Sequence, residues 1–468
     1  MADITRYSAT RLARMIRKKD LSPVEVVDTY LARIDQVNPK INAIVTPLAE
    51  SARQQAKEAE QAVMTGEALP PLHGVPCTIK DPFEMAGVRT TNGSKLFADY
   101  IPTTDATLVK RLKAAGAIPL GKTNTPEFMM SQFTDNVLFG RTRNPYKRDR
   151  SVGGSSGGEA AAIASRMSPM GIGSDIGGSL RLPAHCCGIA SIRPTQGRNP
   201  HTGLYAIGPA HYGYMDVVGP LARSVQDVAL LLSILEGPDG EDPFCQPLAP
   251  TRPKIKPATG LRVGILDLSH LNPVAEEVKQ AVRTAADILA EDGGHVGPAE
   301  DPLFGEIFDT WFTLIGYGFR DISGMIDVDH VIANRDQLDP RFAMLLDLPS
   351  PEPKAALQAE LKRALITRAF FQLYEQYDVI LSPVMSSTAP VGDHGPVVEG
   401  QEQQLLYACM HVYASVLTGD PAAVVPAANG ADKLPIGVQI MAKRGNDTLA
   451  LSAALAVEKG VKVKKPRI

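Results

Sequence analysis

Two glycine- and serine-rich blocks hold the side chains best suited to chemistry. Gly153-Gly-Ser-Ser-Gly-Gly158 precedes an Ala-rich segment, and Asp175-Ile-Gly-Gly-Ser-Leu-Arg181 follows an apolar stretch that begins at Ile172. Glycine permits backbone conformations and close approaches that other residues resist, and successive N–H groups from Ile176 to Ser179 can converge on one concavity, as an oxyanion hole requires. Both blocks lie between apolar segments, which argues against a flexible linker. The pattern indicates acyl transfer through a serine.

A serine nucleophile needs a base that takes its proton. His185 lies close after Ser179, but Ser179 is not in a G-x-S-x-G elbow, and we interpret His185 as a packed, hydrogen-bonding residue. Lys80 ends an apolar stretch, residues 75–79, that would carry it into the interior. Desolvation there would remove its proton and make it a base. The competing interpretation is a strand-end lysine that pairs with Asp81 in solvent, and spacing alone does not decide between the two.

Residues 116–123 match the phosphate-loop pattern G-x-x-x-x-G-K-[ST]. A phosphate loop follows a strand and opens a helix, so that backbone N–H groups meet the anion. Here the order is reversed, because a predicted helix ends at Gly116 and residues 117–120 form a predicted strand. We therefore reject this segment as a phosphate loop, and nucleotide binding stays as an alternative function that a titration with ATP would reveal.

Strand and helix signals alternate along the chain. Short apolar runs predict strands at residues 43–45, 75–80, 117–120, 172–175, 189–192, 261–266, 379–382 and 436–441. Capping residues and helical periodicity predict helices from Ser22 to the pair Asn38-Pro39, over 50–64, from Asp105 to Gly116, over 159–167, from Ser224, over 274–291 and from Asn446. This alternation predicts an α/β sandwich around a mostly buried sheet. We interpret the Pro-rich stretch 238–257 as a surface crossover inside a single domain that spans residues 1–468.

Composition limits the classes of protein that fit this chain. It has 468 residues, 44% of them hydrophobic and 21% charged, with a formal net charge of −3, so we expect neither nucleic-acid nor membrane binding. The five scattered cysteines contain no C-x-x-C pair and indicate free thiols in a reducing compartment. The sequence shows no signal peptide and no long apolar run, and we predict a cytoplasmic protein. The histidines show no metal-ligand spacing, so we expect no metal and no other cofactor.

Several segments taken in order resemble the amidase signature family. They occur in order between residues 71 and 440: Pro71-Leu-His-Gly-Val-Pro-Cys-Thr-Ile-Lys-Asp81, Gly121-Lys-Thr-Asn124, both Gly-Ser blocks, the run through Pro183-Ala184 and Gly188 to Arg193-Pro-Thr195 and Gly197, and Pro435-Ile-Gly-Val-Gln-Ile440. The resemblance implies one large α/β/α sandwich with a mixed central sheet. It also implies hydrolysis of a carbon–nitrogen bond through an acyl-enzyme.

The resemblance assigns a role to each candidate residue. Ser179 matches the nucleophile, Ser155 the bridging serine after a cis peptide, and Lys80 the base; 24 residues separate the two serines, an interval characteristic of the family. The N–H groups of Ile176, Gly177, Gly178 and Ser179 match the oxyanion hole. Met129, Gly153 and Gly154 are expected to bind substrate, and Asp175 to have a structural role near the relay. Arg181 belongs to the motif, but we do not expect it to contact substrate.

The substrate is less constrained. Ile176 and Leu182 depart from the Asp-Thr-Gly-Gly-Ser-Ile-Arg-Gln of transamidating subunits, which favours an independent hydrolase. The cluster Phe128, Met129, Met130 and Phe133 is either a pocket wall or core packing, and residues 304–348 form either a helical cap over the site or an insertion that packs on the sheet. With no spare basic residue for a substrate carboxylate, these features predict a small hydrophobic or aryl amide, anilide or carbamate. The alternative is a glutaminase subunit that delivers ammonia within a complex, and the oligomeric state, a homodimer included, stays open.

Overall fold

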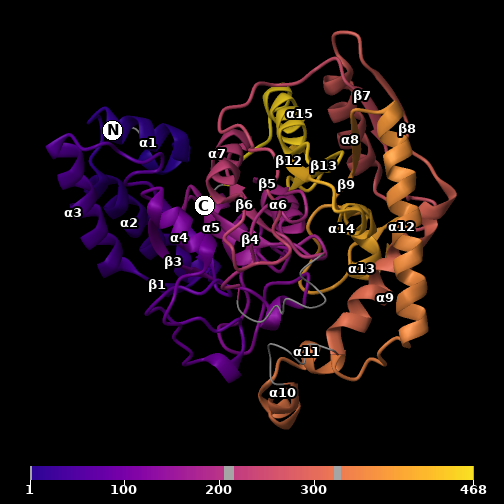
Figure 1. Ribbon diagram of the computed structural model, residues 1–468, viewed down its shortest axis with the longest axis horizontal. Helices are drawn as coiled ribbons and strands as arrows, with labels where there is room; N and C mark the ends of the chain where they lie inside the picture. The colour runs from indigo at the N-terminus through magenta and orange to yellow at the C-terminus, as the bar shows by residue number, and fades with distance from the viewer. Residues whose placement is uncertain (1–2, 205–214, 321–327, 467) are drawn as a thin grey trace.

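An eleven-stranded mixed sheet forms the centre of the computed structural model (Figure 1), which describes residues 3–204, 215–320, 328–466 and 468. The strand order is β1-β3-β2-β4-β6-β5-β12-β13-β9-β7-β8. Their bounds are β1 Ile44–Pro47, β2 Pro76–Lys80, β3 Ile118–Thr123, β4 Met170–Ser174, β5 Ala190–Arg193, β6 Val218–Ala222, β7 Arg262–Ile265, β8 His295–Pro298, β9 Val379–Pro383, β12 Ala422–Asn429 and β13 Pro435–Ala442. A separate hairpin pairs β10 Val397–Val398 with β11 Gln401–Glu402. The predicted α/β sandwich is confirmed.

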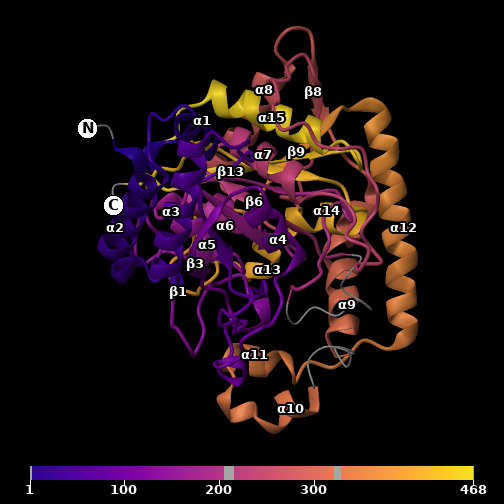
Figure 2. The same cartoon turned by 60° about the vertical axis from the view of Figure 1, so that its left-hand side comes forward.

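Helices cover the sheet and extend beyond its edges (Figures 1 and 2). The α-helices are α1 Ala9–Arg17, α2 Pro23–Ile41, α3 Ala49–Thr65, α4 Thr107–Ala114, α5 Gly157–Ala164, α6 Arg181–Cys187, α7 Val225–Leu235, α8 Glu276–Ala290, α9 Ile307–Arg320, α10 Val328–Ala333, α11 Pro340–Leu345, α12 Pro353–Gln376, α13 Leu405–Ala408, α14 Tyr413–Thr418 and α15 Asp447–Gly460. Short 3-10 turns are η1 Ile4–Arg6, η2 Lys95–Phe97, η3 Glu127–Met129, η4 Pro302–Glu306, η5 Arg335–Gln337 and η6 Met410–Val412. Helices α5 and α6 pack on strands of the central sheet, and α7, α15 and α8 pack side by side against it.

The segment 304–348 is helical where the structure describes it. Helix α9 contacts α12 and α14, and the long α12 forms one edge of the molecule (Figure 2). Phe342 of α11 packs on Phe128 with ring centroids 4.7 Å apart. The segment therefore touches the predicted pocket wall.

Local sequence signals explain most of the element boundaries. Ser22 accepts hydrogen bonds from the N–H groups of Val24 and Glu25, with Pro23 in the first turn of α2, as a capping box predicts. The prediction that Asn38-Pro39 ends this helix is wrong, because α2 continues to Ile41 and ends where Asn42 adopts a left-handed conformation. Pro39 removes one backbone donor from the last turn, and the turn is still completed because the Asn42 N–H donates to the Asn38 carbonyl at 2.7 Å.

The predicted cap at Asp105 is also wrong. The residue before α4 is Ala106, which forms no side-chain cap. The Asp105 carboxylate instead accepts from the Ala86 N–H at 2.8 Å and from the Lys113 ammonium at 2.8 and 2.9 Å. Asp105 therefore ties α4 to the loop after β2 rather than starting the helix.

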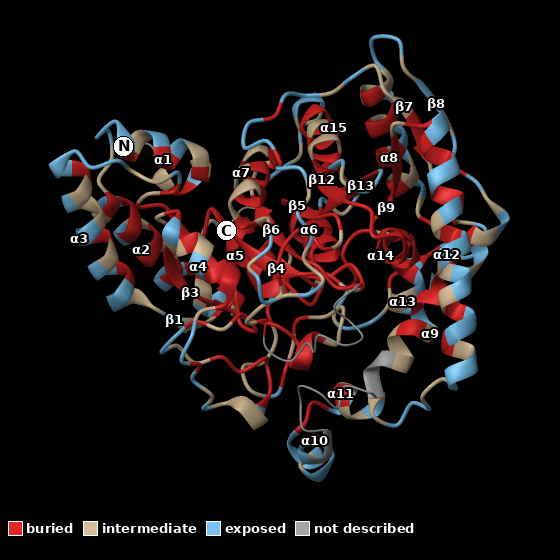
Figure 3. Cartoon of the chain, in the orientation of Figure 1, coloured by how far each residue is buried: buried red, intermediate tan, exposed pale blue. Residues whose placement is uncertain are grey.

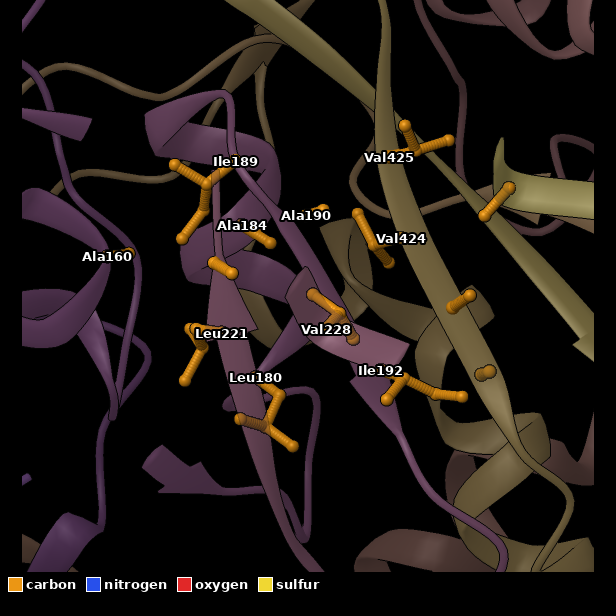
Figure 4. Packing of buried hydrophobic residues seen from close by; sticks show 14 of the residues in the cluster. Ala160, Leu180, Ala184, Ile189, Ala190, Ile192, Leu221, Val228, Val424 and Val425 are labelled. Carbon is orange, nitrogen blue, oxygen red and sulfur yellow. The ribbon is translucent and has the colours of Figure 1, made fainter. Parts of the chain in front are cut away.

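The sheet and the helices nearest to it form a continuous apolar core. Figure 3 shows buried residues concentrated in the central strands and in α5 and α6, with exposed residues along outer helices such as α3 and α12. Figure 4 shows the centre of this packing, where Leu180 and Ala184 of the α6 region lie near Leu221 of β6 and Val424 of β12. Among the described residues, no helix combines the length and apolarity needed to cross a membrane.

Candidate active site

The ends of two parallel strands place a lysine and a serine side by side. Strand β2 pairs with β4 in parallel, and Lys80 and Ser174 are their last residues. Because parallel strands end at the same edge of a sheet, the loops that follow them meet there. Lys80 Nζ lies 2.7 Å from Ser155 Oγ and 3.0 Å from Ser174 Oγ. The interpretation of Lys80 as a solvated partner of Asp81 is wrong, since its side chain is 0% exposed.

The two Gly-Ser blocks pack against each other beside this lysine. The peptide between Gly154 and Ser155 is cis, as the family resemblance implied, and the Thr125 hydroxyl donates to the Ser155 carbonyl at 3.1 Å. The Ser156 N–H donates to the Ser179 carbonyl at 3.3 Å. Exposure increases from Lys80 at 0% through Ser155 at 1% to Ser179 at 8%. The arrangement leads from a buried amine towards a more accessible hydroxyl.

Glycine is required in both blocks because the backbone is crowded. A Cβ on Gly153, whose φ is +73°, would lie 2.8 Å from the Pro183 nitrogen, and one on Gly154 would lie 2.6 Å from the Ser131 carbonyl oxygen. These two predicted substrate-binding glycines therefore form the packed contact between the blocks and the loop after η3.

Burial makes Lys80 an unusual lysine. Burial lowers the pKa of Lys80 to about 7, although the carboxylates of Asp216, Asp175 and Glu159 favour its ammonium form. Burial also raises the pKa of Glu159 to about 8, against hydrogen bonds from Thr78 and Thr123. A large fraction of Lys80 is therefore a neutral amine near pH 7, which is the form that accepts a proton.

Asp175 holds the nucleophile loop in shape. Its carboxylate accepts from the N–H groups of Gly178 at 2.9 Å and Leu180 at 3.2 Å, and from the Arg181 guanidinium at 2.8 and 2.9 Å. Burial disfavours this charge, but Arg181 and Arg193 keep the pKa of Asp175 below its ordinary value. The structural role predicted for Asp175 agrees with these contacts.

These bonds bear on two expectations about the oxyanion loop, one for Gly178 and one for Arg181. The N–H of Gly178, one of the four predicted oxyanion donors, already has an internal acceptor in Asp175 because the loop folds back over this carboxylate. Arg181 is 0% exposed and donates to the Val412 carbonyl, Ser415 Oγ and Gln439 Oε1. Arg181 thus anchors the loop to the core, away from any substrate.

The predicted pocket-wall residues Met129 and Phe128 have different surroundings. Met129 is buried, and its Sδ accepts from Ser174 Oγ at 3.4 Å, while Ser174 Oγ in turn accepts from Lys80 Nζ at 3.0 Å. Phe128 instead packs among apolar residues of the 304–348 segment. Both residues have positive φ, +51° for Phe128 and +62° for Met129, which costs of order 1–3 kcal/mol per residue and is common at functional sites.

Three residues near the site were not identified from the sequence. Ser174 binds Lys80, Trp311 donates from its indole Nε1 to the Ile176 carbonyl at 3.0 Å, and Asp216 influences the charge of Lys80. Asp216 lies just before β6, which pairs with β4 so that Ser174 is opposite Val218. Ser174 directly precedes Asp175 of the second Gly-Ser block, so its position in the sequence indicates that it lies near the site. Trp311 and Asp216 have no neighbouring motif that would indicate this.

His185 has a structural environment, as predicted. Its Nδ1 accepts from the Gly437 N–H at 3.0 Å and its Nε2 donates to the Ser387 carbonyl at 3.0 Å, while burial lowers its pKa. We expect His185→Ala to keep the amide-hydrolysis rate of folded enzyme within a few-fold of wild type. The variant should lose stability, because two buried backbone groups lose their partners at about 1–3 kcal/mol each. Activity per folded molecule and the Tm test this together, and a rate loss above 100-fold at unchanged Tm would make His185 a catalytic group.

Comparisons with known proteins show which family the chain resembles. The family model described as Amidase matches residues 25–451. The chain is 36% identical over 464 residues to the indoleacetamide hydrolase of Bradyrhizobium diazoefficiens, covering 97% of this chain and 86% of that protein. It is 35% identical over 453 residues to a glutamyl-tRNA(Gln) amidotransferase subunit of Roseiflexus sp. strain RS-1, covering 92% of this chain and 91% of that protein.

A solved structure gives the same result for the fold. The crystal structure of a bacterial aryl acylamidase of the amidase signature enzymes superposes with a TM-score of 0.86 at 28% identity, covering 97% of this chain and 96% of that one. Sequence and structure therefore agree over nearly the whole chain. The protein belongs to the amidase signature family and is an amidase that acts on carbon–nitrogen bonds.

Proposed function

We propose that the protein hydrolyses a small hydrophobic or aryl amide, anilide or carbamate through an acyl-enzyme on Ser179. The observation that supports this most directly is the 2.7 Å contact between the Lys80 amine and the Ser155 hydroxyl in a fully buried setting. Neutral Lys80 takes the Ser155 proton while Ser155 takes the Ser179 proton, and Ser179 Oγ attacks the carbonyl carbon of the substrate.

The developing oxyanion is held by backbone N–H groups of the loop that carries Ser179. Those of Ile176, Gly177 and Ser179 serve as donors, and Gly178 contributes only if its bond to Asp175 is shared. The proton held on Lys80 returns through Ser155 to the leaving nitrogen, so the carbon–nitrogen bond breaks and the amine departs neutral. Water then attacks the acyl-enzyme by the same relay and restores both serines.

The substrate class rests on the apolar character of the surroundings. Met129 is linked to Lys80 through Ser174 by two hydrogen bonds, and the aromatic residues Trp311 and Tyr413 stack beside the nucleophile loop with ring centroids 3.8 Å apart. Two relatives are named for an indoleacetamide hydrolase and an aryl acylamidase, and both names describe amides that carry an aromatic group. Aromatic side chains form large apolar surfaces that suit such groups.

A panel of substrates tests the proposal. Purified chain alone should hydrolyse an acetanilide or an aryl carbamate with a higher kcat/KM than a dicarboxylic monoamide or glutamine. A preference for the charged monoamide would refute the substrate class. Turnover of glutamine alone, or no turnover without added partner subunits, would favour the ammonia-delivering function that the amidotransferase relative represents.

The pH dependence of kcat/KM follows from the protonation state of Lys80, the proposed base. Because Lys80 must be neutral to accept a proton and burial lowers its pKa to about 7, kcat/KM should rise with pH through about 7 and then level off. Asp216→Asn removes a carboxylate that favours the ammonium form, so the rising limb should move to lower pH. A pH–rate profile of both enzymes measures this, and a limb that moves to higher pH in the variant would contradict the assignment.

A further inference from the structure

Trp311 connects the segment 304–348 to the loop that carries Ser179. It lies in α9, which packs against α14 (Figures 1 and 2), and its indole Nε1 donates to the Ile176 carbonyl at 3.0 Å across 135 positions of sequence. The side chain is 5% exposed. A buried hydrogen bond between such distant segments fixes one peptide group of the nucleophile loop.

The indole ring also lies directly over the next residue. A Cβ on Gly177 would come within 2.9 Å of Trp311 Cζ2, so the glycine is required for the ring to approach. The ring stacks on Tyr413 with an interplanar angle of 13°, and Phe308 lies 6.3 Å from it. Tyr413 is itself anchored, since its hydroxyl donates to the Leu406 carbonyl at 3.0 Å. The position of the indole is therefore determined on both sides.

Fixing the Ile176 carbonyl determines where the Gly177 N–H points. The peptide group is planar, and in the trans form its C=O and N–H point in opposite directions. With the carbonyl directed at the indole, the Gly177 N–H is turned away from Trp311. On the other side of this residue, the Gly178 N–H is held by Asp175 at 2.9 Å. The loop is thus held at both ends, with the Gly177 N–H between the two anchors.

We propose that Trp311 is a positioning residue for amide hydrolysis, whose indole N–H holds the Ile176–Gly177 peptide so that the Gly177 N–H donates to the oxyanion. This inference rests on the proposed function of the Ser179 loop. Trp311 itself does not touch the reacting atoms. Its contribution is the orientation of a donor that acts mainly in the transition state, so it changes kcat more than KM.

The test is the variant Trp311→Phe, which keeps an aromatic ring against Tyr413 but has no N–H. We expect kcat for the best anilide or carbamate of the panel to fall roughly 10- to 100-fold with KM within about 3-fold, since small misplacements of catalytic groups have effects of this size. The matched control is Tyr374→Phe in α12, which loses one buried hydrogen bond, from the Tyr374 hydroxyl to the Asp420 carboxylate at 3.2 Å, and leaves the Trp311–Tyr413 stack intact. It should retain kcat within about 3-fold and share any change in Tm.

A second pair of variants tests the contact without removing the indole N–H. Gly177→Ala keeps the backbone N–H but places a methyl group against the ring, so it should lower kcat; in the Trp311→Phe background the same change should cost less, because contacting residues are not additive. Equal kcat in wild type and Trp311→Phe, or full additivity of the two changes, would overturn the inference. Failure of the proposed function is distinguishable, because wild type itself would then show no turnover and no labelling at Ser179 by a fluorophosphonate.

Discussion

Ser179→Ala should remove amide hydrolysis almost completely, with a fall in kcat of up to about 10⁶-fold, the size of loss seen when a serine nucleophile is deleted. The reason is that no acyl-enzyme forms without its Oγ, and the buried Ser155 hydroxyl cannot take its place at 1% exposure. Steady-state rates on the preferred anilide or carbamate measure the loss. A fluorophosphonate should modify wild type on the peptide that contains Ser179, detected by mass spectrometry, and leave the variant unmodified.

A second buried serine provides the matched control. Ser191 of β5 is 1% exposed and its hydroxyl donates to the Leu180 carbonyl at 3.2 Å, so Ser191→Ala removes a structural hydrogen bond near the same loop. It should retain activity and labelling within a few-fold. If Ser179→Ala still turned over at more than about 1% of the wild-type rate, or if the label appeared on Ser155, the nucleophile would be misassigned.

The sequence was sufficient wherever the signal is local. Apolar runs located eight of the eleven strands of the central sheet to within about three residues, as for β2, predicted at residues 75–80 and observed as Pro76–Lys80, because the burial of such runs depends mainly on their own composition. Strands β6, β8 and β12 were not predicted. Strand β2 pointed to Lys80 as an interior lysine but not to its partner. Only the family resemblance linked Lys80 to Ser155 and Ser179, because spacing along the chain does not specify which residues meet in the folded protein.

Contacts that depend on the assembled fold had no counterpart in the sequence. The hydrogen bond from Trp311 to the Ile176 carbonyl joins α9 to the loop after β4. Neither residue type predicts that the other lies nearby. The acceptor of the Gly178 N–H depends on a loop conformation with φ of +94°, which a glycine permits but does not dictate. Helix α2 likewise passes Pro39 because its last turn is completed by Asn42, whose N–H donates to the Asn38 carbonyl at 2.7 Å.

Lys80→Met should lower kcat/KM at pH 8 by at least about 100-fold and by up to roughly 10⁴-fold, the usual contribution of a general base. Methionine has a similar length and no proton acceptor of comparable strength, so the Ser155 and Ser179 protons have no destination. The fold should persist, because an apolar side chain suits a fully buried position better than an amine. The rising limb of the pH profile near pH 7, which titration of Lys80 produces in wild type, should also disappear from the residual activity.

The chain supplies a closely matched control in Lys122. This lysine of β3 is also 0% exposed, and burial lowers its pKa to about 8, although Asp81 and Glu84 favour its charged form. Strand register pairs Lys122 with Ile79 and Lys80 with Thr123, so alternation places the two lysines on opposite faces of the sheet, and Lys122 donates to Thr90 instead of to a serine block. Lys122→Met should therefore keep the wild-type pH limb and most of the rate, with circular dichroism confirming the fold of both variants. If the two substitutions reduced kcat/KM equally while both proteins stayed folded, loss of a buried amine in general would explain the effect, and Lys80 would lose its assignment as the base.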